Sequence, residues 1–309
     1  MACRTVLATL NRRPAGGVTS PAALDALTAD TEVWVRRAAQ AGARLLVCTE
    51  IYPQLGDHGR LEVADYVEPS DGGSLLRVLD LARRYDLDIV WPRFEEGPDG
   101  RHNVSLYVSR RGEVLGRYRK MFPTLGELDD GILPGREPVV VETDFGRVGF
   151  AICFDLNFAE VRDGYRALAP DVIAFSSMYR GGVKLDFWAV DLGCYLVSSY
   201  GTDFGRIVDR GGRTVAAAGY EALALAPVNL NSVQLHLDYN WDKLDAILAR
   251  YAAEVSFACA TPEGRFVLSS ERVPISELIA EFELLTVPAY FATARARRAA
   301  ALAPSGGVP

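Results

Sequence analysis

Residues 148–160 read VGFAICFDLNFAE, and they are the most informative part of the chain. Its first five residues are apolar without polar alternation, which is typical of a strand covered on both faces. Cys153 ends the run, just before a segment expected to be helical. Unpaired N–H groups at such a place favour the thiolate, so Cys153 is a candidate nucleophile. The alternative is a buried core cysteine, the more common fate of this residue type.

Similar short apolar runs recur along the chain. They cover residues 5–10, 43–48, 87–91 and 171–175, and segments of helical periodicity at residues 21–41 and 74–85 lie between them. This alternation predicts an α/β protein. Residues 104–108 with 114–118, and 206–208 with 214–217, flank glycine-containing turns and predict two antiparallel hairpins. Mixed pairing argues against a pure Rossmann sheet, and no glycine-rich nucleotide-binding motif opens a helix.

Two further strand ends carry candidate residues. Glu50 follows an apolar run, where partial desolvation raises a carboxyl pKa toward the range useful for a general base. The alternative for Glu50 is a solvated loop carboxylate. Lys120 follows the second strand of the first hairpin, with Glu127 shortly after it, and each taken alone is an ordinary surface charge. Cys48 is a rival thiol, but it lies inside its apolar run and is interpreted as packing.

Composition excludes several classes of protein. The chain has 309 residues, a mass of 33.7 kDa and a net charge of -7, which argues against nucleic acid or an anionic membrane as a partner. No stretch is apolar for long enough to span a bilayer. The apolar amino terminus is interpreted as a first strand and not as a signal peptide. Five scattered cysteines favour reduced thiols and a cytoplasmic location, and the spacing of cysteines and histidines predicts no metal site.

Taken together, residues 5–218 resemble the nitrilase superfamily. The apolar strand ending in Glu50 resembles the family's strand before its catalytic glutamate. The segment that begins at Asn103, continues as a strand and ends in Tyr118-Arg119-Lys120 resembles the family segment that precedes and includes its catalytic lysine. Residues 149–160 resemble its strand, cysteine, aromatic and Asp, and residues 169–179 keep its spacing to the next strand. The resemblance implies an α/β fold, a four-layer α-β-β-α sandwich with mixed β-sheets.

The resemblance also implies a chemistry, the hydrolysis of a non-peptide C–N bond by a Glu-Lys-Cys triad. Cys153 would be the nucleophile that forms a thioester, Glu50 the general base and Lys120 the oxyanion stabiliser, aided by the backbone N–H of Phe154. Glu127 resembles a second glutamate that orients the substrate or the lysine. No metal or organic cofactor is implied.

The substrate is expected to be a small amide or N-carbamoyl compound. Asp155 after an aromatic residue resembles relatives that cleave amides and carbamoyl groups, whereas nitrile-cleaving relatives tend to have Trp-Glu there. Phe154, Asp155, Met178, Tyr179 and Arg180 are expected to contact the substrate. Arg180 would be an anion contact, and its alternative is an exposed loop arginine.

Some positions depart from the family pattern. Phe122 stands where the family usually has histidine, and Ala159 where it has proline. Carbamoylases of amino acids often place arginines just after the cysteine, but this chain has Leu156 and Asn157. This difference counts against a substrate of that subclass.

Residues 1–240 are predicted to form the catalytic domain, and residues 241–309 a C-terminal helical extension on the same domain or a partner subunit. Residues from 221 onward are expected to complete the second sheet first. A homodimer or larger homo-oligomer is expected because relatives assemble that way. The alternative functions are an acyltransferase or amide-forming enzyme, a nitrile hydrolase, a non-catalytic binding protein, and a Cys-His hydrolase using His102 or His236.

Overall fold

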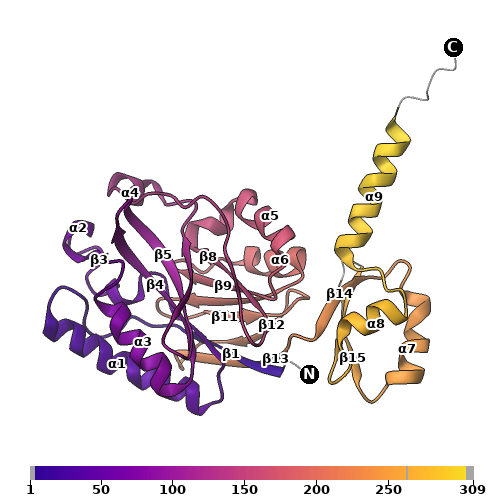
Figure 1. Cartoon of the computed structure of the whole chain (residues 1–309), viewed down its shortest axis with the longest axis horizontal. Helices are drawn as coiled ribbons and strands as arrows, with labels where there is room; N and C mark the ends of the chain where they lie inside the picture. The colour runs from indigo at the N-terminus through magenta and orange to yellow at the C-terminus, as the bar shows by residue number, and fades with distance from the viewer. Residues whose placement is uncertain (1–3, 262–263, 304–309) are drawn as a thin grey trace. The chain divides into compact units, whose positions relative to one another are not determined.

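The computed structural model describes residues 4–261 and 264–303. The chain divides into two compact units, Thr5–Val228 and the remainder. Figure 1 labels many of the helices and strands of both units. The predicted division of roles between residues 1–240 and 241–309 stays a prediction.

The first sheet of the larger unit is mixed, with strand order β13-β1-β2-β4-β5-β6 and β3 paired to β4. Its strands are β1 (Arg4–Leu10), β2 (Leu45–Val47), β3 (Glu68–Pro69), β4 (Asp88–Gly97), β5 (Gly100–Val108), β6 (Val114–Arg119) and β13 (Leu223–Asn229). β1, β2 and β4 pair in parallel, whereas β4, β5 and β6 pair antiparallel. The β5–β6 pair is the first predicted hairpin.

The second sheet has the order β12-β11-β10-β9-β8-β7. Its strands are β7 (Val140–Glu142), β8 (Arg147–Ile152), β9 (Val172–Ser177), β10 (Tyr195–Tyr200), β11 (Arg206–Val208) and β12 (Thr214–Ala217). β8, β9 and β10 are parallel and fully or nearly fully buried, as their continuous apolar sequences predict. β11 and β12 form the second predicted hairpin.

Helices cover the outer faces of both sheets. α1 (Pro21–Gln40) and α3 (Ser74–Tyr85) share an apolar core with the first sheet, and α5 (Ala159–Leu168) and α6 (Val183–Leu192) share one with the second. α1 begins at Ser20, whose hydroxyl accepts a 3.2 Å hydrogen bond from the Ala23 N–H. Shorter helices are η1 (Tyr52–Gln54), α2 (Val63–Tyr66), α4 (Leu125–Asp129) and η2 (Cys153–Asn157).

The two sheets face each other through buried polar contacts as well as apolar ones. The Thr9 hydroxyl donates to the Ser198 carbonyl at 2.7 Å, and the Ser176 hydroxyl donates to the Cys48 carbonyl at 2.8 Å. The second contact brings the carboxyl ends of β2 and β9 together, although they lie in different sheets. The predicted four-layer α-β-β-α sandwich is therefore confirmed.

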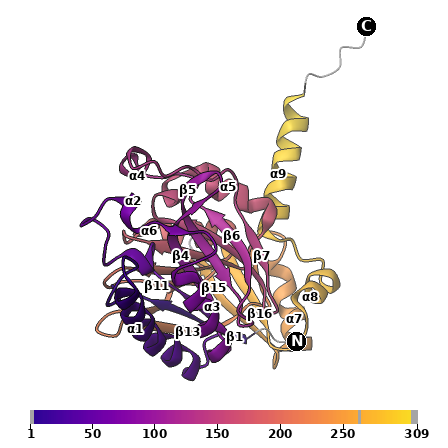
Figure 2. The same ribbon diagram turned by 60° about the vertical axis from the view of Figure 1, so that its left-hand side comes forward.

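The smaller unit is built on a three-stranded antiparallel sheet of order β14-β16-β15. Its elements are β14 (Ser232–His236), η3 (Trp241–Lys243), α7 (Leu244–Tyr251), β15 (Val255–Thr261), β16 (Arg265–Ser270), α8 (Ile275–Glu281) and α9 (Val287–Leu302). α9 runs away from this sheet in both ribbon views (Figures 1 and 2).

The predicted helical character of this region is confirmed, but the expectation that residues from 221 onward complete the second sheet is wrong. β13 joins the first sheet, and residues 232–270 form a sheet of their own around a separate apolar core. None of the helices in the described ranges combines the length and hydrophobicity needed to cross a bilayer.

Candidate active site

Cys153 lies at a sharp turn between β8 and η2. Its φ of 46° is in the left-handed region, which costs a residue with a Cβ roughly 1 kcal/mol or more. Such strain persists only where the surrounding structure holds the residue, and it is common at functional sites. The turn leaves Cys153 half-buried at the carboxyl end of a central strand. As the first residues of η2, Cys153 and Phe154 present backbone N–H groups that have no carbonyl one turn before them.

Asp155 holds this turn in place. One carboxylate oxygen accepts hydrogen bonds from the Ile152 N–H at 3.0 Å and the Tyr118 hydroxyl at 2.7 Å. The other oxygen accepts one from the Phe122 N–H at 2.8 Å. Asp155 is completely buried, and burial raises the pKa of its carboxyl to about 6 despite these donors. Asp155 therefore ties the Cys153 turn to the segment that follows β6.

The raised pKa of Asp155 predicts a pH dependence of stability. Its carboxyl titrates near 3.8 when unfolded and about 6 when folded, so between these values only the native state binds the proton. Raising the pH through this window should lower the wild-type unfolding free energy by up to about 3 kcal/mol. Asp155→Asn lacks this titration, so the stability advantage of wild type over the variant should shrink by about 2 kcal/mol from pH 4 to pH 6.

Denaturant unfolding of both proteins at several pH values between 4 and 7 measures this difference. Asp65→Asn, at an exposed position on α2, is the matched control for removal of a carboxylate. A wild-type advantage over Asp155→Asn that stays constant across the range would contradict the effect of burial on this carboxyl.

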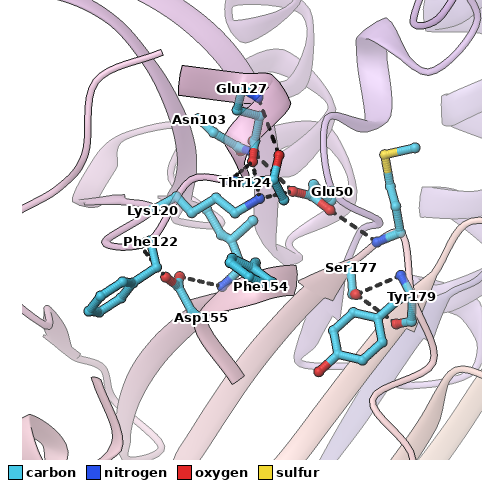
Figure 3. Close-up of polar contacts among 12 residues, drawn as sticks. Glu50, Asn103, Lys120, Phe122, Thr124, Glu127, Phe154, Asp155, Ser177 and Tyr179 are labelled. Atoms are coloured by element: carbon cyan, nitrogen blue, oxygen red, sulfur yellow. Dashed lines mark hydrogen bonds and ion pairs between the residues drawn. The ribbon is translucent and has the colours of Figure 1, made fainter. Parts of the chain in front are cut away.

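A buried ammonium lies between two carboxylates close to the turn. The Lys120 Nζ donates to Glu50 Oε1 at 2.8 Å and to Glu127 Oε2 at 2.7 Å, and the Lys120 side chain is only 1% exposed. The Asn103 amide donates to the same two residues, to Glu50 Oε1 at 2.9 Å and to Glu127 Oε1 at 2.7 Å. Figure 3 shows these side chains pointing toward one another. Both donors thus bridge both carboxylates.

Glu50 and Lys120 lie just beyond strands, whereas Glu127 lies on a short helix. Glu50 follows β2, and the next residue, Ile51, has a left-handed φ of 45° that turns the chain away from the strand. Lys120 directly follows β6. Glu127 lies on α4, where it forms a capping box with Thr124: its carboxylate accepts the Thr124 N–H at 2.7 Å. The second sheet also contributes, because the Met178 N–H after β9 donates to Glu50 Oε2 at 3.0 Å.

The charges of the cluster set its protonation. Burial alone would lower the pKa of Lys120, but Glu50 and Glu127 outweigh it and raise the pKa above its usual value. Burial would likewise raise the pKa of Glu127, but Lys120 outweighs it and the pKa is lowered. The Lys120 ammonium and the Glu127 carboxylate are therefore both charged at neutral pH.

The Cys153 thiol is protonated at rest. Burial and the nearby Glu50 carboxylate raise its pKa to about 12, and Lys120, the Met178 N–H and the Ser177 hydroxyl lower it only in part. This thiol needs a base to become a nucleophile. The sequence-based expectation that its position favours the thiolate is therefore outweighed by burial. The rival Cys48 is fully buried in the first apolar core, where burial alone raises its pKa.

The residues that follow β9, Met178 and Tyr179, lie close to Glu50 and Cys153. Tyr179 is half-buried, with its backbone N–H donating to the Ser177 hydroxyl at 2.9 Å. Its own hydroxyl is buried and has no hydrogen-bond partner among the described residues. Burial and the nearby Cys153 raise the pKa of Tyr179 to about 12, so the hydroxyl keeps its proton and can donate it to a bound molecule. Phe154 is 37% exposed, with its ring edge against Phe158 at a centroid distance of 5.1 Å.

Two predicted substrate contacts are placed differently. Arg180 is exposed, pairs with Asp203 at 3.3 Å and lies over the Phe204 ring at 4.2 Å, so its charge is already partnered. The carboxylate of Asp155 is buried and engaged with donors of the protein itself. Asn103 was noted in the sequence only as part of a motif, and nothing there indicated that it bridges Glu50 and Glu127. The described residues contain no group of three or more His, Cys, Asp or Glu that could hold a metal ion.

Comparisons with known proteins agree with this fold. The yeast Nit3 protein (Saccharomyces cerevisiae), a member of the nitrilase superfamily, superposes with a TM-score of 0.62 at 18% identity, over 73% of this chain and 90% of that one. An amidase from Nesterenkonia sp. superposes with a TM-score of 0.62 at 20% identity, over 80% and 96%. These two structures share the fold.

Sequence relatives extend the agreement. Deaminated glutathione amidase of Mus musculus is 25% identical over 238 residues, which cover 63% of this chain and 72% of the relative. The model of the carbon–nitrogen hydrolase family matches residues 15–236. The chain belongs to the carbon–nitrogen hydrolase family. It is therefore an enzyme that acts on C–N bonds other than peptide bonds.

Proposed function

We propose that the chain hydrolyses a small amide or N-carbamoyl compound through a thioester on Cys153, with Glu50 as general base and Lys120 as oxyanion stabiliser. One observation supports this most: Lys120 is buried between Glu50 and Glu127, beside a strained cysteine at a strand end. Two of the three named relatives are amidases, which favours an amide over a nitrile.

In the acylation step the Sγ atom of Cys153 attacks the substrate carbonyl carbon while its proton moves to Glu50. Because the pKa of the thiol is raised, transfer to Glu50 must accompany attack. The carbonyl oxygen becomes an oxyanion, and the Lys120 ammonium and the Phe154 N–H are the donors we assign to it. Glu50 then gives the proton to the departing nitrogen, the C–N bond breaks, and the thioester remains.

Deacylation repeats the same sequence with water. Glu50 takes a proton from the water as its oxygen attacks the thioester carbon. Collapse of the second oxyanion breaks the C–S bond, the proton returns to sulfur, and the carboxylic acid product leaves. Glu50 transfers protons in both acylation and deacylation, so both steps depend on the position of its carboxylate. The Met178 N–H and the Asn103 amide fix its two oxygens.

Other residues have positioning roles in this proposal. Asn103 and Glu127 orient Lys120 and Glu50 through the hydrogen bonds that they share. Asp155 shapes the Cys153 turn, and this role replaces the substrate contact expected from sequence. Phe154, Met178 and Tyr179 remain the proposed substrate contacts, with the Tyr179 hydroxyl as the polar one.

Intact-mass spectrometry tests the thioester. Wild type and Glu50→Gln are mixed with aliphatic amides, including the butyramide bound by a variant of the Nesterenkonia amidase, and with N-carbamoyl compounds. For wild type we expect an acyl adduct that maps to Cys153 and release of ammonia. For Glu50→Gln we expect no release of ammonia. Ammonia release without any dependence on Glu50 would contradict the proposal. Product analysis with and without added hydroxylamine separates hydrolysis from acyl transfer, since both proceed through the thioester.

Arg180 provides a smaller prediction. Because its guanidinium is exposed and already pairs with Asp203, Arg180→Ala should change kcat/KM for neutral amides by less than about threefold. Steady-state kinetics on amides with and without a carboxylate measure this, with Arg60→Ala as an exposed control. A large loss of kcat/KM confined to amides that carry a carboxylate would instead support Arg180 as the anion contact expected from sequence.

A further inference from the structure

A separate cavity of about 470 Å³ lies at the edge strand of the first sheet. Its walls come from β5, β6 and the segment 133–139 (β5 and β6 are labelled in Figure 2). Five charged side chains line it: Asp99, Arg117, Arg119, Arg136 and Glu137. A cavity of this size accommodates a small ligand.

Three of the five charged side chains that line this cavity are arginines. Burial and the repulsion of Arg93 and Arg119 lower the pKa of Arg117. Arg117 pairs with Glu95 and Arg119 with Asp99, whereas Arg136 is exposed and forms no ion pair with any other described residue. An anion in the cavity would give Arg136 a partner and share the charge of the two paired guanidinium groups, which bind oxyanions through paired N–H donors.

His102 adds a group of a different kind to the cavity wall. Its Nδ1 lies 2.9 Å from the Leu133 carbonyl, which can only accept, so Nδ1 carries the proton. Its Nε2 is buried and has no hydrogen-bond partner among the described residues. The nearest carboxylate oxygen, from Asp99, is 3.6 Å away, and burial and the charge of Arg119 lower the His102 pKa. Nε2 thus offers a lone pair that needs a donor.

We propose that this cavity binds a phosphate group, either inorganic phosphate or a phosphate monoester. At neutral pH a phosphate group carries oxygens that accept from guanidinium. Inorganic phosphate always keeps a P–OH that can donate to His102 Nε2, and a phosphate monoester keeps one in part of its population. The proposal rests on the three arginines, the unpartnered imidazole and the cavity that they share, and it does not depend on the proposed function.

Backbone hydrogen bonds join the chain at this cavity wall to Lys120 and Glu127. The Gly135 N–H donates to the Lys120 carbonyl at 2.7 Å, and the Ile132 N–H donates to the Glu127 carbonyl at 2.8 Å. A Cβ at Gly135 would lie 2.2 Å from the Arg119 carbonyl oxygen, so this close contact requires glycine. A phosphate held by Arg119 and Arg136 would connect the strand end to segment 133–139 and restrain the backbone that carries Lys120.

Isothermal titration calorimetry with inorganic phosphate tests the site, at neutral pH and constant ionic strength set by sodium chloride. Wild type should show saturable binding, and Arg136→Ala should weaken it by about tenfold through loss of a charge-assisted contact. Arg60→Ala, an exposed arginine elsewhere, is the matched control and should bind as wild type does. Sulfate, which has no hydroxyl at this pH, should bind more weakly than phosphate.

Hydrogen exchange supplies a second measurement. Saturating phosphate should slow exchange in peptides covering residues 119–136 of wild type, but not of Arg136→Ala. Binding that is absent, that is unchanged in Arg136→Ala, or that is no tighter than sulfate binding would overturn the proposal. A phosphate monoester that binds more tightly than inorganic phosphate would identify the esterified form as the ligand. None of these measurements uses the hydrolase activity, so their failure would leave the proposed function untouched.

Discussion

Cys153→Ala is expected to lower kcat/KM for amide hydrolysis by about 10⁴-fold or more, because no other group can form the thioester. The same substitution should abolish the acyl adduct in intact-mass spectra. Its effect on the unfolding free energy should be small, since alanine keeps the Cβ and removes only the sulfur of a half-buried residue. Steady-state kinetics, intact mass and denaturant unfolding measure the three quantities.

Cys48→Ala is the matched control for this experiment. Cys48 is fully buried in the first apolar core, just beyond the strand that precedes Glu50. Removing its sulfur should lower stability by about 1 kcal/mol and leave kcat/KM within about threefold of wild type. Retained activity in Cys153→Ala, or a loss confined to Cys48→Ala, would show that the wrong thiol has been assigned.

The sequence was most informative where a reactive polar residue directly follows an apolar strand. Buried parallel strands need continuous apolar residues, so β8 and β9 are visible as short runs, and the polar residues just after them stand out. Glu50 and Cys153 follow strands of different sheets, so it is the packing of the two sheets that brings these two strand ends together. The hairpins were equally visible because their turns contain glycine.

The smaller unit was less visible because its strands bury polar residues. In β14 the side chains of Ser232 and Gln234 are buried while Val233 is partly exposed, which reverses the usual alternation. β16 begins with a buried arginine, Arg265. A pattern based on apolar periodicity does not detect such strands, and the family resemblance ends before them.

The directions in which side chains point could not be predicted from the sequence either. Asp155 follows the nucleophile closely, but the turn at Cys153 directs its carboxylate inward to Tyr118 and Phe122. Arg180 follows Tyr179, yet it pairs with Asp203, which is distant in sequence. In both cases the partner that decides the role comes from another element, and only the folded chain brings it close.

Lys120→Met should have the largest combined effect on activity and stability. It removes the proposed oxyanion donor, which lowers kcat by about 10²–10³-fold. It also leaves the Glu50 and Glu127 carboxylates buried without their cation, which should lower the unfolding free energy by about 3–5 kcal/mol. Lys184→Met, at an exposed position on α6, is the stability control and should stay within about 0.5 kcal/mol of wild type.

The double variant Lys120→Met/Glu127→Gln separates the two effects of Lys120. If the stability loss comes from two uncompensated carboxylates, neutralising Glu127 should restore part of the unfolding free energy, whereas Glu127→Gln alone should be destabilising because Lys120 then loses one partner. Activity should not recover in the double variant, because the ammonium is still missing from the oxyanion position. Additive stability losses would instead mean that Lys120 and Glu127 act independently. Recovery of kcat would mean that Lys120 only balances charge and that another donor stabilises the oxyanion.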